Sequence, residues 1–131
     1  MPTILVLDDE PVVSEIVKKV LQRAGYSVIA VKTSREAIIA AATFDGSIAL
    51  MVSNFHLSDG HMGSEAVAQI RRQHPDMKVI HISGYPEEEV ARKGGMTDGA
   101  VFLQKPFPPQ LLIQKVHELL ATGRSSSVSG I

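Results

Sequence analysis

The chain has 131 residues, of which 44% are hydrophobic, so its length and composition fit one folded domain and exclude a disordered or fibrous protein. Its formal net charge is −1 and it has no long basic run, so composition gives no sign of nucleic-acid binding. The absence of cysteine excludes disulfides, thiolate metal sites and a cysteine nucleophile. The N-terminus lacks a signal-peptide pattern, and no apolar run approaches the roughly 20 residues of a membrane span. We therefore expect a cytoplasmic protein that binds no membrane.

Short apolar segments alternate along the chain with longer segments of helical periodicity. In chain order the expected elements are a strand at 4–7, a helix at 11–24, a strand at 26–31, a helix at 35–43, a strand at 48–52, a helix at 64–73, a strand at 79–82, a helix at 87–93, a strand at 100–103 and a helix at 108–120. Pro11 suits a first helical turn, where its missing N–H costs nothing, and Ser34 is the expected N-cap of the second helix.

This alternation predicts an α/β fold with three layers, in which helices cover both faces of a five-stranded parallel sheet. The first strand, at 4–7, is apolar at every position, which is typical of a strand buried on both faces. The expected arrangement is the doubly wound, flavodoxin-like (βα)5 order. We expect one domain over residues 1–121. Residues 122–131 are rich in serine and have no pattern able to bury apolar surface, so we expect a disordered C-terminal tail.

Polar residues stand at the carboxyl ends of four predicted strands, where the functional crevice of such sheets lies. In chain order they are Asp8 and Asp9, then Asn54, then Ser83, then Lys105. Two adjacent carboxylates repel by about 4 kcal/mol at ~4 Å in an effective dielectric near 20, and Mg²⁺ relieves that repulsion. An ammonium and a hydroxyl suit phosphoryl oxygens. Each residue alone has an ordinary explanation, such as an acid at a helix N-terminus. Their joint placement favours a phosphoryl site.

The histidines do not have the spacing of a structural metal site. They are His56, His61, His74, His81 and His117. We expect His56 and His61 to be solvated in a loop. His81 lies within an apolar strand, so we expect it to be hydrogen-bonded and partly buried.

Three segments resemble the receiver domains of response regulators in two-component signalling. They are residues 4–11 (ILVLDDEP), 82–85 (ISGY) and 102–107 (FLQKPF). The second and third are most similar to the receivers of hybrid sensor histidine kinases. The resemblance covers residues 3–121 and implies a phosphorelay signal-transduction module that is not an enzyme.

The resemblance also implies a Mg²⁺ site, which this sequence alters at one position. Asp8 and Asp9 would be the metal-binding acids, with the main-chain carbonyl of His56 as a further ligand. The family has its phosphate-accepting aspartate where this chain has Asn54. An uncharged amide is a poor nucleophile toward phosphorus, so Asn54 would not form an acyl phosphate. The missing charge would also weaken Mg²⁺ binding.

The remaining matched positions imply phosphate recognition and partner binding. Ser83 would bond a phosphoryl oxygen, and Lys105 would pair with it. Phe102 would be the aromatic switch residue, whose rotamer follows activation. The implied partner is a sensor histidine kinase or a phosphotransfer protein, bound by a face over roughly residues 87–120. We expect a monomer or weak dimer that binds no nucleic acid.

Asn54 has two explanations: a natural substitution in a degenerate receiver, or an introduced replacement that blocks phosphorylation. We favour the first because Ser58, in the same loop, also stands where the family usually has proline. Two other functions remain as alternatives, a small phosphatase-like enzyme with Asp8 as nucleophile and a nucleotide- or flavin-binding domain. Short loops argue against the enzyme. The absence of a Gly-rich phosphate loop after the first strand argues against the binder.

Overall fold

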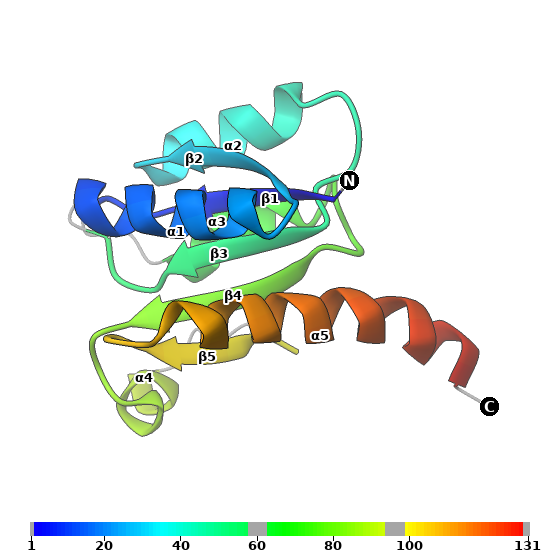
Figure 1. The fold of residues 1–131 in the computed structure, drawn as a ribbon. Helices are drawn as coiled ribbons and strands as arrows, with labels where there is room; N and C mark the ends of the chain where they lie inside the picture. The colour runs from blue at the N-terminus through cyan, green and yellow to red at the C-terminus, as the bar shows by residue number, and fades with distance from the viewer. Residues whose placement is uncertain (1, 58–62, 94–98, 130–131) are drawn as a thin grey trace.

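The computed structural model describes residues 2–57, 63–93 and 99–129, in which five strands and five helices alternate (Figure 1). In chain order they are β1 (Thr3–Leu7), α1 (Pro11–Arg23), β2 (Ser27–Val31), α2 (Ser34–Thr43), β3 (Leu50–Asn54), α3 (Gly63–Ile70), β4 (Lys78–Ser83), α4 (Glu87–Lys93), β5 (Val101–Gln104) and α5 (Pro109–Ser129). The strands pair in parallel in the order β2-β1-β3-β4-β5. This order confirms the predicted flavodoxin-like fold.

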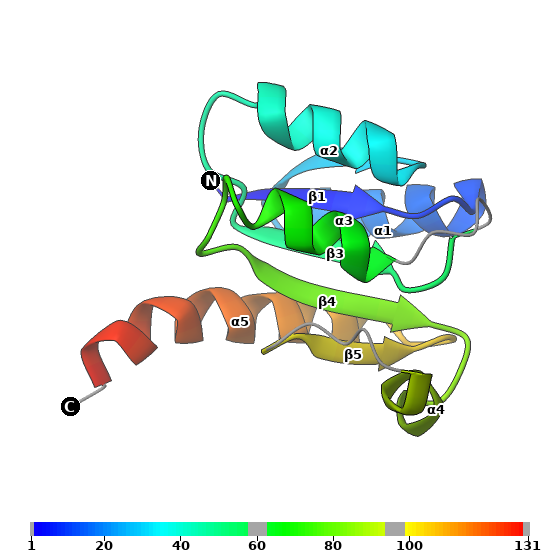
Figure 2. The same ribbon diagram turned by 180° about the vertical axis from the view of Figure 1, so that it is seen from behind.

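Successive side chains of β1 pack on opposite faces of the sheet. Ile4 and Val6 belong to the core beneath α1 and α5, whereas Leu5 and Leu7 belong to the core beneath α2 and α3. Figures 1 and 2 show these two helical layers from opposite sides, with α4 beside β5 at the edge of the sheet. Burial on both faces explains why β1 is apolar throughout.

Two helix ends differ from the prediction. The N-cap of α2 is Thr33, and the expected cap Ser34 is instead the first helical residue. Thr33 Oγ1 accepts the Glu36 N–H at 3.1 Å, and Glu36 Oε1 accepts the Thr33 N–H at 3.3 Å, which forms a capping box. Helix α3 ends at Ile70 rather than at residue 73, because turns precede Pro75 and a residue before proline disfavours helical geometry.

Helix α5 continues to Ser129, over residues 122–129 where we expected a disordered tail. These residues contain no proline, and Gly123 costs only about 1 kcal/mol relative to alanine, so nothing in the sequence stops the helix. The domain boundary at residue 121 stays a prediction. In the described part of the chain, no helix has both the length and the hydropathy needed to cross a bilayer.

Candidate functional site

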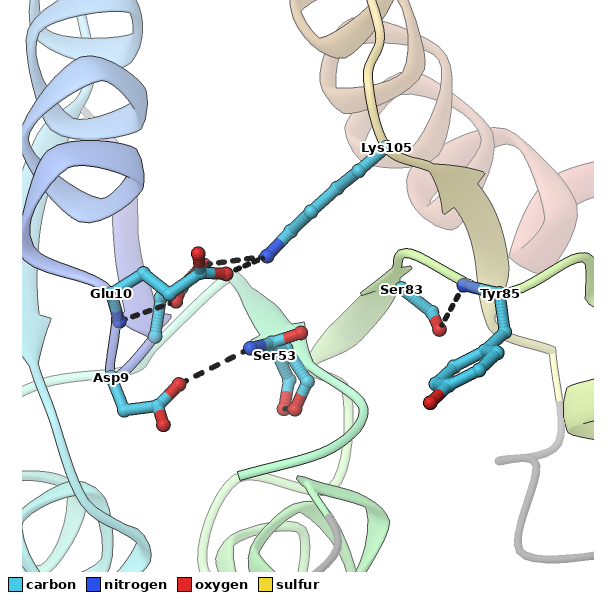
Figure 3. A network of polar contacts seen from close by, with 8 residues as sticks. Asp9, Glu10, Ser53, Ser83, Tyr85 and Lys105 are labelled. Atoms are coloured by element: carbon cyan, nitrogen blue, oxygen red, sulfur yellow. Dashed lines mark hydrogen bonds and ion pairs between the residues drawn. The ribbon is translucent and has the colours of Figure 1, made fainter. Parts of the chain in front are cut away.

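The polar residues predicted at the strand ends lie at one edge of the sheet, and Figure 3 shows Asp9, Ser83 and Lys105 among them. Asp8 directly follows β1, Asn54 ends β3, Ser83 ends β4 and Lys105 directly follows β5. These four strands are consecutive neighbours in the sheet, so their carboxyl ends lie side by side. The Lys105 N–H donates to the Ser83 carbonyl at 2.7 Å, which fixes the start of the β5–α5 connection against β4.

The Asp8 carboxylate is buried at the centre of this edge, with only 1% of the residue exposed. Its Oδ1 accepts the Glu10 N–H at 2.9 Å, whereas its Oδ2 is buried without a hydrogen-bond partner. Burial raises the pKa of the Asp8 carboxyl, although the Glu10 N–H and the Lys105 ammonium oppose that rise. A buried carboxylate oxygen without a hydrogen bond is costly, and a bound cation would remove that cost. The site therefore fits a hard divalent cation.

Asn54 lies against the second acid of the pair. It is 7% exposed, and its Nδ2 donates to Asp9 Oδ1 at 3.3 Å. The side chain at the end of β3 therefore contacts the predicted metal-binding acids directly. Within the described residues, no three His, Asp or Glu side chains are grouped as a metal-ligand set. A cation here would thus combine the two carboxylates with neutral oxygens, such as main-chain carbonyls or water.

Lys105 points from the end of β5 toward the acids that follow β1 (Figure 3). Its Nζ lies 2.6 Å from Glu10 Oε1 and 3.7 Å from Asp8 Oδ2. The second distance is in ion-pair range but is too long for a hydrogen bond, which agrees with the unpartnered Asp8 Oδ2. Glu10 follows Asp8 and Asp9 in the same acidic run, and the sequence suggested a role for it only as an accessory acid in the phosphatase-like alternative.

Ser83 and two aromatic rings lie on the other side of Asn54. The Ser83 hydroxyl oxygen is buried and accepts the Tyr85 N–H at 3.0 Å. The Tyr85 ring meets the His56 ring edge to face, with centroids 5.2 Å apart. His56 is therefore only partly exposed between these rings, and less solvated than expected for a loop residue. His61, like Ser58, lies outside the described residues.

Phe102, the predicted switch residue, is half-buried on β5 and lies opposite His81 of β4 in the strand register. His81 is fully buried, with its ring edge-on to Phe55 at a centroid distance of 5.3 Å. We expected only partial burial, but β4 has neighbours on both edges and helices over both faces. Desolvation, assisted by the positive charge of Arg71, lowers the pKa of His81 from 6.5 to about 4. Its imidazole is therefore neutral near pH 7.

Gly63, the first residue of α3, contributes to the site in a way that the sequence did not predict. A Cβ at this position would collide with Ser53 Oγ and with the Asn54 carbonyl oxygen. The Gly63 N–H also donates to the Phe55 carbonyl at 2.8 Å. Helix α3 can therefore begin against the end of β3 only because this residue has no side chain. In the sequence, a glycine before a helical pattern is only a weak indication of close packing. Its role becomes clear from the contact between Gly63 and the end of β3.

The parallel sheet and the acids, amide, hydroxyl and lysine at its carboxyl edge define a receiver module of two-component signalling. Residues 4–117 match the family described as the response regulator receiver domain. The chain belongs to this family.

Relatives and solved structures agree with this assignment. The chain is 31% identical over 118 residues to the sensor kinase CckA of Brucella abortus, a match that covers 90% of the chain but 12% of the kinase. A response regulator receiver protein from Sinorhizobium medicae has a TM-score of 0.82 at 29% identity, with 93% of this chain and 96% of that one covered. The receiver domain of the hybrid histidine kinase CckA has a TM-score of 0.77 at 28% identity, with 90% and 98% covered. The similarity to hybrid-kinase receivers is thus confirmed.

Proposed function

We propose that this receiver signals through protein contacts and does not accept a phosphoryl group at position 54. The observation that carries the proposal is the position of Asn54, at the end of β3 with its amide on Asp9. In the family this strand end carries the phosphate-accepting aspartate. The amide nitrogen has its electron pair delocalised and the group has no charge, so it cannot replace a carboxylate as nucleophile.

The cation site would be weaker than in a receiver with an aspartate at position 54. Asp8, Asp9 and the main-chain carbonyl of His56 would hold Mg²⁺, which when bound neutralises carboxylate and phosphoryl oxygens. The unpartnered, buried Oδ2 of Asp8 supports this ligand set. Asn54 brings no negative charge to it. Mg²⁺ binding should therefore persist at reduced affinity.

Phosphate recognition would come from the two strand ends beyond Asn54. Ser83 and Lys105 lie at the carboxyl ends of β4 and β5, next to the acids and Asn54 (this group of strand-end residues is called the pocket below), and we propose that they contact an oxyanion there. Phe102 would report the state of the pocket through its position on β5, next to the Ser83 strand. We propose no enzymatic turnover. The burial of Asp8 and its bond to the Glu10 N–H disfavour Asp8 as a nucleophile.

A histidine kinase or phosphotransfer protein would be the partner, docking near the pocket on a face over residues 87–120. A groove between α1 and α5 adjoins this surface, because its lining includes Lys105 and residues of α5 and is almost entirely apolar. Its residues are Val13, Ile16, Val17, Val20, Lys105, Pro106, Phe107, Pro109 and Leu112. Ile16, one of the lining residues, is 52% exposed, so the groove presents an apolar side chain to water.

The test of the proposed function restores the acid. We expect Asn54→Asp to be phosphorylated by a small acyl-phosphate donor with Mg²⁺, as measured by mass spectrometry of the intact protein. The unaltered chain should stay unmodified. Asp8→Asn in the Asn54→Asp background is the control. It lacks one of the proposed metal ligands and should therefore not be phosphorylated. Modification of the unaltered chain at this site, or none on Asn54→Asp, would contradict the proposal.

A further inference from the structure

The Lys105 ammonium lies between two acids and is closer to the one outside the pocket. Its Nζ is 2.6 Å from Glu10 Oε1 but 3.7 Å from Asp8 Oδ2. The Glu10 side chain is 57% exposed and that of Asp8 is 2% exposed. A buried carboxylate attracts a cation more strongly than a solvated one at the same distance, because water screens the solvated charge. The position of the ammonium therefore needs a geometric cause.

The backbone supplies that cause. Glu10 is the N-cap of α1 with extended geometry, φ −91° and ψ 110°, and its side chain makes no capping bond. Its N–H is bound to Asp8 Oδ1 at 2.9 Å, so the Glu10 main chain is fixed relative to the buried acid. From that anchor the side chain reaches the ammonium of Lys105, as Figure 3 shows.

The contact between Glu10 and Lys105 is important because of the residue at position 54. A carboxylate there would offer the ammonium a further anchor at the pocket, but the amide of Asn54 donates to Asp9 instead. Without Glu10, the nearest acid to Lys105 Nζ would be Asp8. The ammonium would then occupy the oxygen that a divalent cation needs.

We propose that Glu10 is a positioning residue that holds the Lys105 ammonium away from Asp8 Oδ2 and so leaves this oxygen open to a divalent cation. The inference rests on the proposed cation site at Asp8 and Asp9. Glu10 would then affect cation affinity through Lys105, and not only through the charge of the Glu10 carboxylate.

Titration with Mg²⁺ alone, followed by backbone amide NMR signals of the pocket, tests this in the full chain. We expect Glu10→Gln to weaken Mg²⁺ binding about fivefold, the scale of one partly exposed charge contact. Lys105→Met should strengthen binding, because a competing cation is removed. In the Lys105→Met background, Glu10→Gln should then reduce the Mg²⁺ affinity clearly less. Glu15→Gln, the same charge change on an exposed part of α1, is the matched control and should leave the affinity unchanged.

A measurement without metal separates this inference from the proposed function. The side-chain NMR signals of Lys105, assigned by their loss in Lys105→Met, should shift in Glu10→Gln and not in Glu15→Gln. Unchanged Lys105 signals would overturn the inference. So would equal losses of Mg²⁺ affinity from Glu10→Gln in the two backgrounds, since equal losses indicate a plain charge effect. Phosphorylation of Asn54→Asp tests the proposed function independently of these results.

Discussion

At the scale of single residues, the charge balance of the pocket depends on position 54. The Asn54 amide donates to Asp9 and so stabilises the Asp9 carboxylate. A carboxylate at this position would remove the donor and add a repulsion, unless a cation lies between the acids.

The effect of Asn54→Asp on the free energy of unfolding should therefore depend on whether the cation is present. We expect a loss of about 1–3 kcal/mol in the free energy of unfolding with a chelator, from a lost hydrogen bond and a new like-charge contact. Mg²⁺ should recover much of that loss. Urea denaturation in chelator and in Mg²⁺ measures both, with the unaltered chain as control. A loss of the same size in both conditions would count against a cation site here.

His81 offers a pH-dependent prediction at the same scale. Burial lowers its pKa to about 4 in the folded protein, against 6.5 when solvated. The unfolded chain thus takes up the proton at higher pH than the folded chain does. The stability contributed by neutral His81 is complete above pH 6.5 and is lost as the pH falls toward 4, by about 3 kcal/mol in total.

His81→Leu isolates this contribution, because the other titrating groups are common to both proteins. Urea denaturation at about pH 7 and about pH 5 measures it. As the pH falls between these values, the free energy of unfolding of the unaltered chain should fall more than that of His81→Leu. NMR titration of the His81 ring checks the pKa directly. A stability difference between the two proteins that does not change with pH would contradict the buried, neutral imidazole.

At the scale of elements, the start of α2 depends on a cap that differs from the one we predicted. Thr33 bonds Glu36 reciprocally, whereas the Ser34 hydroxyl is buried without a hydrogen bond. We expect Thr33→Ala to cost about 1 kcal/mol in the free energy of unfolding, and Ser34→Ala to cost nothing or to stabilise slightly. Thermal or urea denaturation of the pair decides this. The reverse order of effects would show that Ser34 caps the helix.

The start of α3 depends on the missing side chain of Gly63. Gly63→Ala would force a methyl group into Ser53 Oγ and the Asn54 carbonyl, so α3 and the end of β3 must separate. We expect a loss of about 1–3 kcal/mol, the range for overpacked sites, with shifted NMR signals around Asn54. Gly84→Ala is the matched control, because a Cβ there meets nothing within 4 Å. Equal stability of the two variants would contradict the close approach.

At the scale of the whole molecule, the strand order brings together residues that are far apart in the chain. Asp8 and Lys105 are at opposite ends of the sequence, yet their charged atoms lie 3.7 Å apart. This happens because β1, β3, β4 and β5 are consecutive in the sheet and parallel, so polar residues after each strand collect at one edge. The two cores hold the sheet between α1 and α5 on one face and α2 and α3 on the other, which sets the position of this edge.

The order of strands and helices, the parallel sheet and the polar residues at the strand ends could be predicted from sequence, because apolar runs and helical periodicity are local patterns. Thr33, which has Glu36 three residues after it, could also have been found there. Only the tertiary structure decided that Lys105 contacts Glu10 more closely than Asp8, that Gly63 packs on the end of β3 and that His81 is fully buried. These depend on distances across neighbouring strands and helices, which no spacing along a single chain contains.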